Sequence, residues 1–172
     1  MEIHTKELMK YIRNHFALDW QGIHGVPHWA RVLRNGLEIS KQSGADMHVV
    51  RLFALLHDSC RENDWKDPEH GYRAADLSVE LLDKYFTATE DQMILLIESL
   101  CGHSEGMISK NPTIQTCWDA DRLDLGRVGK YPDENYLSLH AVPFIDIAYK
   151  WSIGFSYISS IQMEKLQNSE CT

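Results

Sequence analysis

The sequence predicts an all-α protein made of one compact domain, residues 1–172, with six to eight helices. Apolar residues recur at helical spacing in several segments, and helix-starting and helix-ending residues bracket those segments. No segment shows the polar and apolar alternation of a half-buried strand. With 172 residues and a hydrophobic content of 44%, the chain is long and apolar enough to bury a sizeable core.

The first helix is expected near residues 3–18, where Leu8 and Ile12 fall on one side. The second is expected over residues 28–43. It should end at Gly44, because glycine is frequent just past a helix C-terminus.

The third helix should begin after the N-cap residue Asp46 and end near His57 and Asp58. It is apolar almost all round, which is typical of a buried helix. Burying an ionised aspartate without a partner is costly. Asp58 could pair with an arginine such as Arg61 while His57 is an ordinary core histidine, or both side chains could bind a metal ion.

Capping sequences mark the next three helices. A cap followed by proline occurs at Asp67 and again at Asn111, which predicts helix starts at both places. Thr89 with Gln92 three residues later predicts a capping box.

Residues 126–143 are expected to form a loop, long enough to cover a site, that contains His140. A final helix is expected over residues 144–165. Its many aromatic side chains fit core or oligomer contacts, so a homodimer is possible.

Composition excludes several classes of protein. The net charge of −8 argues against binding extended nucleic acid. No apolar run is long enough for a membrane span and no secretory signal is visible, so we expect a cytoplasmic protein. The cysteines show no CxxC spacing and are expected to be reduced thiols, at Cys60, Cys101, Cys117 and Cys171.

Three carboxylates lie close together at Asp119, Asp121 and Asp124. Asp121 shares a helix face with Trp118 and with Leu125. An aspartate on an apolar stripe needs a cation, and a metal ion would supply one.

The ordered set of His28, His57 with Asp58, and the distant Asp121 resembles the HD superfamily of metal-dependent phosphohydrolases. The local sequences are similar as well, with His-x-x-x-His-x-x-Arg-Val around His28 and Asp-Ala-Asp-Arg-Leu around Asp121. The resemblance spans about residues 19–129. It implies an HD-type helical bundle in which these four side chains hold one divalent metal ion. Asp121 is preferred over its neighbouring aspartates because the family's ligand precedes x-Leu.

A donor set of two nitrogens and two oxygens suits Mn²⁺, Fe²⁺, Co²⁺, Ni²⁺ or Zn²⁺ better than Mg²⁺. A water bound to such an ion is acidified and can attack phosphorus. Asp58 would take part in catalysis through the metal. Glu62, one helical turn further on, is either a general acid or base or simply a solvated side chain.

Two further histidines, His70 and His103, fall where some HD proteins have extra ones. There such side chains either line a phosphate pocket or bind a second metal. His70 is expected in the first turn of a helix, which favours an anion. His103 could equally be a helix C-cap after Gly102. With His24 and Arg31, these histidines form the expected substrate-binding set.

The expected function is therefore hydrolysis of a small phosphorylated molecule, such as a nucleotide or a phosphomonoester, by a metal-activated water. One alternative is a dinuclear-iron oxygenase that uses His70 and His103 as added ligands. The other is a module that binds a nucleotide without turning it over. Despite the overall negative charge, arginines near the motifs could make a locally positive pocket, at Arg31, Arg34, Arg61, Arg73 and Arg122.

Overall fold

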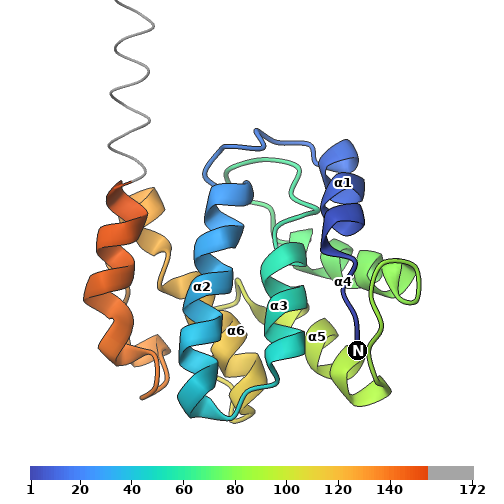
Figure 1. The fold of residues 1–172 in the computed structure, drawn as a ribbon. Helices are drawn as coiled ribbons and strands as arrows, with labels where there is room; N and C mark the ends of the chain where they lie inside the picture. The colour runs from blue at the N-terminus through green and yellow to red at the C-terminus, as the bar shows by residue number, and fades with distance from the viewer. Residues whose placement is uncertain (155–172) are drawn as a thin grey trace, which may run out of the picture.

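Helix α3 (Met47–Leu56) lies inside the helical bundle of the computed structural model, which describes residues 1–154 (Figure 1). It packs against α2 (Val26–Ser43), α5 (Glu90–Gly102) and α6 (Pro112–Arg122). α2 also packs directly on α6, and α4 (His70–Leu81) packs on α5. α1 (Thr5–His15) contributes the buried Leu8 and Ile12 to the same core.

Residues 1–154 contain helices, short 3₁₀ turns and two isolated β-bridges, with no extended sheet. The predicted all-α fold class is thus confirmed. Within the same residues, no helix is both long and apolar enough to cross a membrane.

Local chemistry explains most helix starts. The Asp46 carboxylate accepts hydrogen bonds from the amides of His48 and Val49 at the start of α3. The capping box of Thr89 and Gln92 is present at α5, and Asn111 caps α6 with Pro112 in the first turn. Each of these features was predicted from the sequence.

The predicted start of the fourth helix was wrong by two to three residues. α4 begins at His70, and the Asp67 side chain does not cap it. The Asp67 carboxylate instead accepts hydrogen bonds from the Glu62 amide and from Arg73. Asp67 is therefore engaged in an ion pair with Arg73 and does not cap the helix.

The close contact between α2 and α3 depends on Gly36. A Cβ atom at this position would lie 2.5 Å from Cγ1 of Val50, so only glycine allows the two helices to approach as they do. Gly36 lies in the middle of α2 and Val50 in the first turn of α3, so this contact sets the spacing of the helices that carry His28 and lead to His57.

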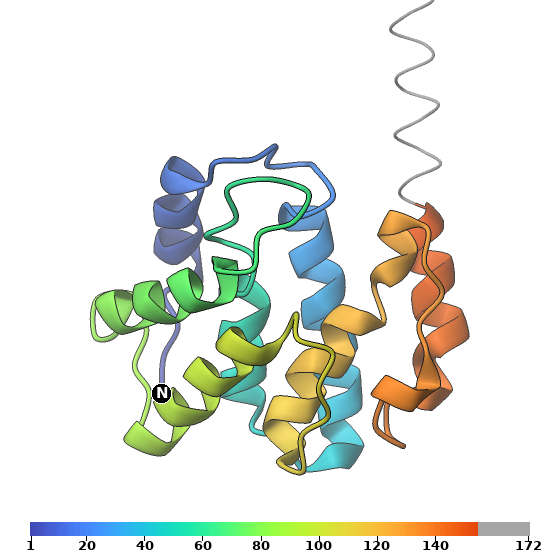
Figure 2. The ribbon, with the colours of Figure 1, turned by 180° about the vertical axis from the view of Figure 1, so that it is seen from behind.

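A last helix begins at residue 145 and is described to residue 154; the rest of the predicted stretch to residue 165 lies outside the described residues. It lies at the edge of the bundle next to α2 (Figures 1 and 2). A small second apolar cluster joins it to α2 and to the end of α6, formed by Ile39, Leu123, Ala141, Ile145 and Ala148.

Candidate metal centre

Three of the four predicted metal ligands, His28, His57 and Asp58, form one buried donor group that could hold a metal ion, and Asp121 lies next to His28. His28 comes from the first turn of α2, His57 and Asp58 follow α3, and Asp121 lies in the last turn of α6. His28 Nε2 lies 2.9 Å from His57 Nε2 and 3.3 Å from Asp121 Oδ1. It lies 3.5 Å from Asp58 Oδ2.

The outer nitrogens of these imidazoles are tied to fixed acceptors. His28 Nδ1 donates a hydrogen bond to Asp124 Oδ2 at 2.7 Å. His57 Nδ1 donates to the carbonyl of Phe53 at 3.2 Å. Because each Nδ1 carries the proton, the Nε2 lone pairs of both rings point at each other.

Two facing lone pairs at 2.9 Å repel each other unless a positive charge, either a proton or a metal ion, lies between them. The Oδ1 atom of Asp121 is also buried and has no hydrogen-bond partner among residues 1–154. Both observations indicate a place where a metal ion can bind.

The distances fit a single ion as well. Two atoms that each lie about 2.1 Å from one metal are about 3.0 to 3.4 Å apart at angles from 90° to the tetrahedral angle. The three distances from His28 Nε2 run from 2.9 to 3.5 Å. The donors of His28, His57 and Asp58 could therefore bind one metal ion, and Asp121 adjoins them at His28.

Electrostatics agree that the centre attracts positive charge. Burial and Arg127 lower the pKa of His28, but the neighbouring carboxylates of Asp121, Asp124 and Asp58 outweigh them and raise it to about 9. Burial lowers the pKa of His57 to about 3. The cluster thus favours one positive charge where the two rings meet.

A second donor group adjoins the first through Asp58. His70 Nε2 lies 2.7 Å from His103 Nε2, and Asp58 Oδ1 lies 3.4 Å from the former and 3.9 Å from the latter. The His103 Nδ1 donates to the carbonyl of Leu100 at 2.7 Å, and the His70 Nδ1 donates to the carbonyl of Asp67. All three side chains are buried, so this group could also hold a metal ion.

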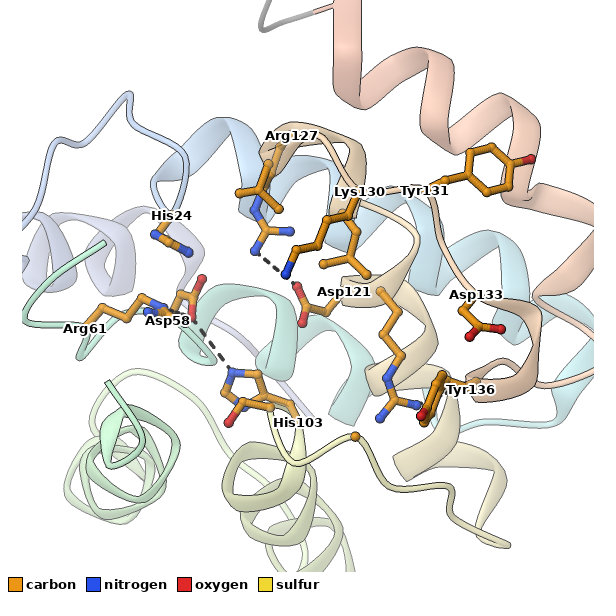
Figure 3. A pocket seen from close by; sticks show the side chains of 15 residues that line it. His24, Asp58, Arg61, His103, Asp121, Arg127, Lys130, Tyr131, Asp133 and Tyr136 are labelled. Atoms are coloured by element: carbon orange, nitrogen blue, oxygen red, sulfur yellow. Dashed lines mark hydrogen bonds and ion pairs between the residues drawn. The ribbon is translucent and has the colours of Figure 1, made fainter. Parts of the chain in front are cut away.

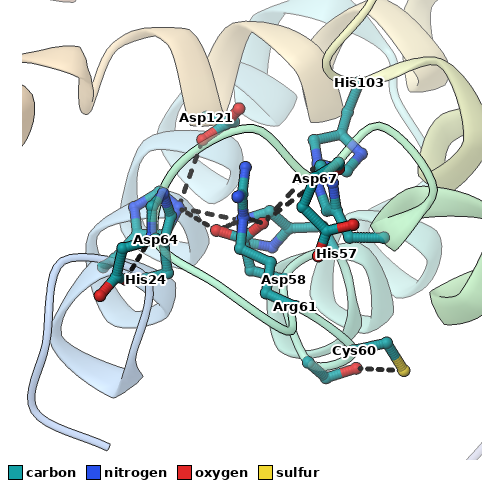
Figure 4. Close-up of polar contacts among 12 residues, drawn as sticks. His24, His57, Asp58, Cys60, Arg61, Asp64, Asp67, His103 and Asp121 are labelled. Carbon is teal, nitrogen blue, oxygen red and sulfur yellow. Dashed lines mark hydrogen bonds and ion pairs between the residues drawn. The ribbon is translucent and has the colours of Figure 1, made fainter. Parts of the chain in front are cut away.

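Asp58 therefore stands between two pairs of histidines, with one oxygen toward each pair. Figure 4 shows this cluster, with His57 and His103 on the same carboxylate. The position of His70 differs from the expected phosphate contact, since its ring nitrogen faces His103 and Asp58. His103 follows α5 as a C-cap and belongs to the cluster at the same time.

Arg31 was expected to bind the substrate, but it contacts Asp124 instead. Its guanidinium donates two hydrogen bonds to Asp124, at 2.5 and 2.9 Å, and the same carboxylate holds His28. Arg31 is not among the residues that line the pocket above the cluster. Its contacts indicate that it orients His28 through Asp124.

A pocket of about 560 Å³ opens over the cluster (Figure 3). Asp58, Asp121 and His103 form part of its wall, and His24 lines it as predicted. The remaining lining residues come largely from the loop after α6 and are mostly basic or aromatic, including Arg61, Arg122, Arg127, Lys130, Tyr131 and Tyr136.

His24 is held on the side opposite to the loop. Its Nδ1 lies 2.9 Å from Asp64 Oδ1, and burial lowers its pKa even though Asp58 and Asp64 oppose that effect. Figure 3 shows His24 and Arg61 at one end of the pocket, with Asp133 and Tyr136 at the other. The pocket therefore runs from the loop before α4 to the loop after α6.

Glu62 does not reach the pocket, which corrects the suggestion that it is an acid or base. Its side chain is 70% exposed and lies 3.8 Å from Arg73 Nε, facing a separate depression. Asp119 is also excluded as the fourth ligand, because its carboxylate accepts hydrogen bonds from the Gln115 side chain and from the Ser138 amide.

Several residues of the site were missed in the sequence. Asp124 was considered only as a competing ligand, whereas it is the partner of His28. Arg127 and Lys130 were overlooked, although they lie in the loop that the sequence had suggested as a cover. Their basic character so soon after Asp121 was the available signal.

Described cysteines match the expectation of reduced thiols. Cys60, Cys101 and Cys117 are unpaired, and Cys171 lies outside the described residues.

The crystal structure of a predicted HD superfamily hydrolase from an uncultured Thermotogales bacterium is similar to this chain. The two share 24% sequence identity, the match covers 94% of each chain, and the TM-score is 0.66. No family model and no curated protein matches the sequence. The structural match, over nearly the whole length, shows that this chain has the HD-domain fold.

Proposed function

We propose that the protein is a metal-dependent phosphohydrolase that acts on a small phosphorylated molecule, such as a nucleotide or a phosphomonoester. The observation that carries this proposal is a buried His and Asp cluster whose acidic side opens into a pocket lined by four basic side chains. The fold match to a protein described as a predicted hydrolase supports the same reaction class.

His28, His57, Asp58 and Asp121 would hold the metal ion, most suitably Mn²⁺ or another ion that accepts both nitrogen and oxygen ligands. Such an ion, when bound, lowers the pKa of a water ligand and polarises a phosphoryl oxygen.

The protein's own contribution is to bind and position the phosphoryl group. Arg127, whose guanidinium lies 3.7 Å from Asp121, and Lys130 line the pocket beside the cluster. Arg61 lines it on the side of Asp58. Cationic donors recognise phosphate oxygens through charge-assisted hydrogen bonds, so a dianionic phosphoryl group fits this end of the pocket.

The position and tautomer of His24 suit proton transfer. Its Nδ1 hydrogen bonds to Asp64, which leaves Nε2 as the free acceptor of the neutral ring. Since burial lowers its pKa, the neutral form dominates near pH 7. We assign His24 to contact the substrate and to exchange a proton with a phosphate oxygen or a leaving group.

Turnover assays test this function. Purified protein loaded with Mn²⁺, Co²⁺ or Ni²⁺ is incubated with a panel of nucleotides and phosphomonoesters, and release of phosphate or pyrophosphate is measured. We expect release that requires the metal and is lost in His57→Ala and Asp121→Asn. Tight nucleotide binding without release would instead identify a binding module, and no binding or release with any substrate would contradict the proposal.

The position of Asp58 between two histidine pairs favours one second candidate, a dinuclear-iron oxygenase. Two ions could share the Asp58 carboxylate, with His70 and His103 on the second. Protein loaded anaerobically with Fe²⁺ and then exposed to oxygen separates the two reactions. Oxygen consumption that depends on two irons per chain would favour the oxygenase.

A further inference from the structure

Arg61 contacts Asp58, the carboxylate that lies between the two histidine pairs. Its Nε donates a hydrogen bond to Asp58 Oδ1 at 2.8 Å, and its side chain is 12% exposed. The same oxygen atom faces His70 Nε2 at 3.4 Å and His103 Nε2 at 3.9 Å. Arg61 and the second donor group therefore compete for one carboxylate oxygen.

The guanidinium is held where it is by its own loop. Its NH1 group contacts the carbonyls of Asn63 and Trp65, each at 3.4 Å. An arginine stays charged at any physiological pH, so Arg61 places a permanent positive charge on the Oδ1 side of Asp58. Figure 4 shows Arg61 and His103 at the same carboxylate.

The opposite oxygen is left for the first donor group. Asp58 Oδ2 lies 3.5 Å from His28 Nε2 and 3.7 Å from His57 Nε2, and Asp121 adds a second carboxylate there. Among the described residues, the second group has no carboxylate besides Asp58 within the donor cluster. A dication there would share its only carboxylate oxygen with a guanidinium and would be repelled by it.

We propose that the Arg61 guanidinium supplies, at Asp58 Oδ1, the positive charge that a second metal ion would otherwise supply. The protein therefore binds one metal ion per chain. The ion bound by His28, His57, Asp58 and Asp121 then neutralises Oδ2, and the guanidinium neutralises Oδ1. His70 and His103 form a latent metal site, which becomes a strong one when the charge of Arg61 is removed. This inference rests on the metal site of the proposed function and determines its stoichiometry.

Metal stoichiometry tests the inference without substrate. Full-length wild type, Arg61→Gln and Arg61→Lys are stripped with chelator and dialysed against Mn²⁺ buffered at about ten times the dissociation constant of the first site. The number of metal ions per chain is then measured by inductively coupled plasma mass spectrometry, and circular dichroism confirms that each variant is folded. Arg61→Met is a second uncharged variant if Arg61→Gln does not fold.

We expect one Mn²⁺ in wild type and in Arg61→Lys, and two in Arg61→Gln. Adding His103→Ala to Arg61→Gln should return the count to one. Arg127→Gln is the matched control, because it removes a basic side chain that lies 3.7 Å from Asp121 and leaves Asp58 Oδ1 unchanged. This control should keep one ion.

Each other result overturns the inference in a recognisable way. Two ions in wild type, or one ion in Arg61→Gln, would show that Arg61 does not set the stoichiometry, while a metal-dependent hydrolase would still stand. Two ions in Arg127→Gln would show that general positive charge, and not the contact with Asp58, limits binding. No bound metal in any protein would contradict both the inference and the proposed function.

Discussion

Residues outside the proposed ligand set orient the side chains within it. Asp124 accepts a hydrogen bond from the Nδ1 of His28, and its other contacts come from Arg31. These contacts fix which nitrogen of His28 faces the ligands, and residue 124 lies 96 positions away in the chain. The sequence showed three nearby aspartates but not which of them contacts His28, because that depends on the direction in which each side chain points in the folded protein.

Replacing Asp124 by Asn tests this role. The change weakens the acceptor on His28 and leaves Arg31 without its carboxylate, so we expect the affinity for Mn²⁺ to fall by about 10- to 100-fold. Competition with a fluorescent chelator measures this affinity directly.

Asp119→Asn is the control for that change. Asp119 is also buried in α6, but it contacts Gln115 and Ser138 and not a histidine. Metal affinity should stay within about twofold of wild type. Equal losses in both variants would mean that Asp124 acts only through general stability.

At the scale of elements, the helix caps show what local sequence can predict. The caps at Asp46, Thr89 and Asn111 depend on amides two or three residues away, and all three are present. The start of α4 depends on the pairing of Asp67 with Arg73, so the sequence signal there was misleading. Helix ends determined by local chemistry are predictable, and those determined by tertiary contacts are not.

Asp46 should stabilise α3 and thereby the position of His57. Burial raises the pKa of Asp46, but hydrogen bonds from Gln92, Val49 and His48 outweigh this and lower it below its usual value. Asp46→Ala should reduce the free energy of unfolding at pH 7 by about 1 to 2 kcal/mol. Asp46→Asn keeps an acceptor for the helix amides and should lose less.

The same cap predicts a pH dependence. A carboxyl group whose pKa is lower in the folded state stabilises the fold above its unfolded pKa, and this contribution is lost as the pH falls through the folded pKa. Urea unfolding of wild type and Asp46→Ala from pH 7 down to pH 3 should therefore show their difference shrinking below about pH 4. A constant difference over this range would contradict an ionised cap.

At the scale of the whole molecule, the pocket is built from parts that are distant in the chain. The motif residues provide its floor, and the loop after α6 provides much of its wall. The C-terminal helix holds that loop, since the Tyr131 hydroxyl donates a hydrogen bond to Asp146 at 2.6 Å and its ring packs on Tyr149. The sequence predicted a covering loop, but it could not show what anchors the loop.

Gly126 lies directly against the C-terminal helix. A Cβ atom there would lie 2.0 Å from Oγ of Ser152 and 2.8 Å from a ring carbon of Tyr149. Gly126→Ala should therefore displace the helix and lower the free energy of unfolding by about 1 to 3 kcal/mol. Thermal unfolding measures the loss.

Gly154 offers the matched control on the same helix. In the part of the chain that the structure describes, and apart from the helix's own backbone and the adjacent residues, no atom lies within 4 Å of a Cβ built at Gly154. Gly154→Ala should therefore leave the melting temperature unchanged or slightly raise it. A melting temperature for Gly126→Ala equal to that of wild type would show that the loop and the helix are not packed as described.

The central claim is that His28, His57, Asp58 and Asp121 bind one transition metal ion. A crystal structure of Mn²⁺-loaded protein, with anomalous data collected on both sides of the manganese edge, tests it most directly. We predict one strong anomalous peak per chain, within bonding distance of His28 Nε2, His57 Nε2, Asp58 Oδ2 and Asp121 Oδ1. A peak bound only by His70 and His103, or no peak in the cluster, would contradict the account.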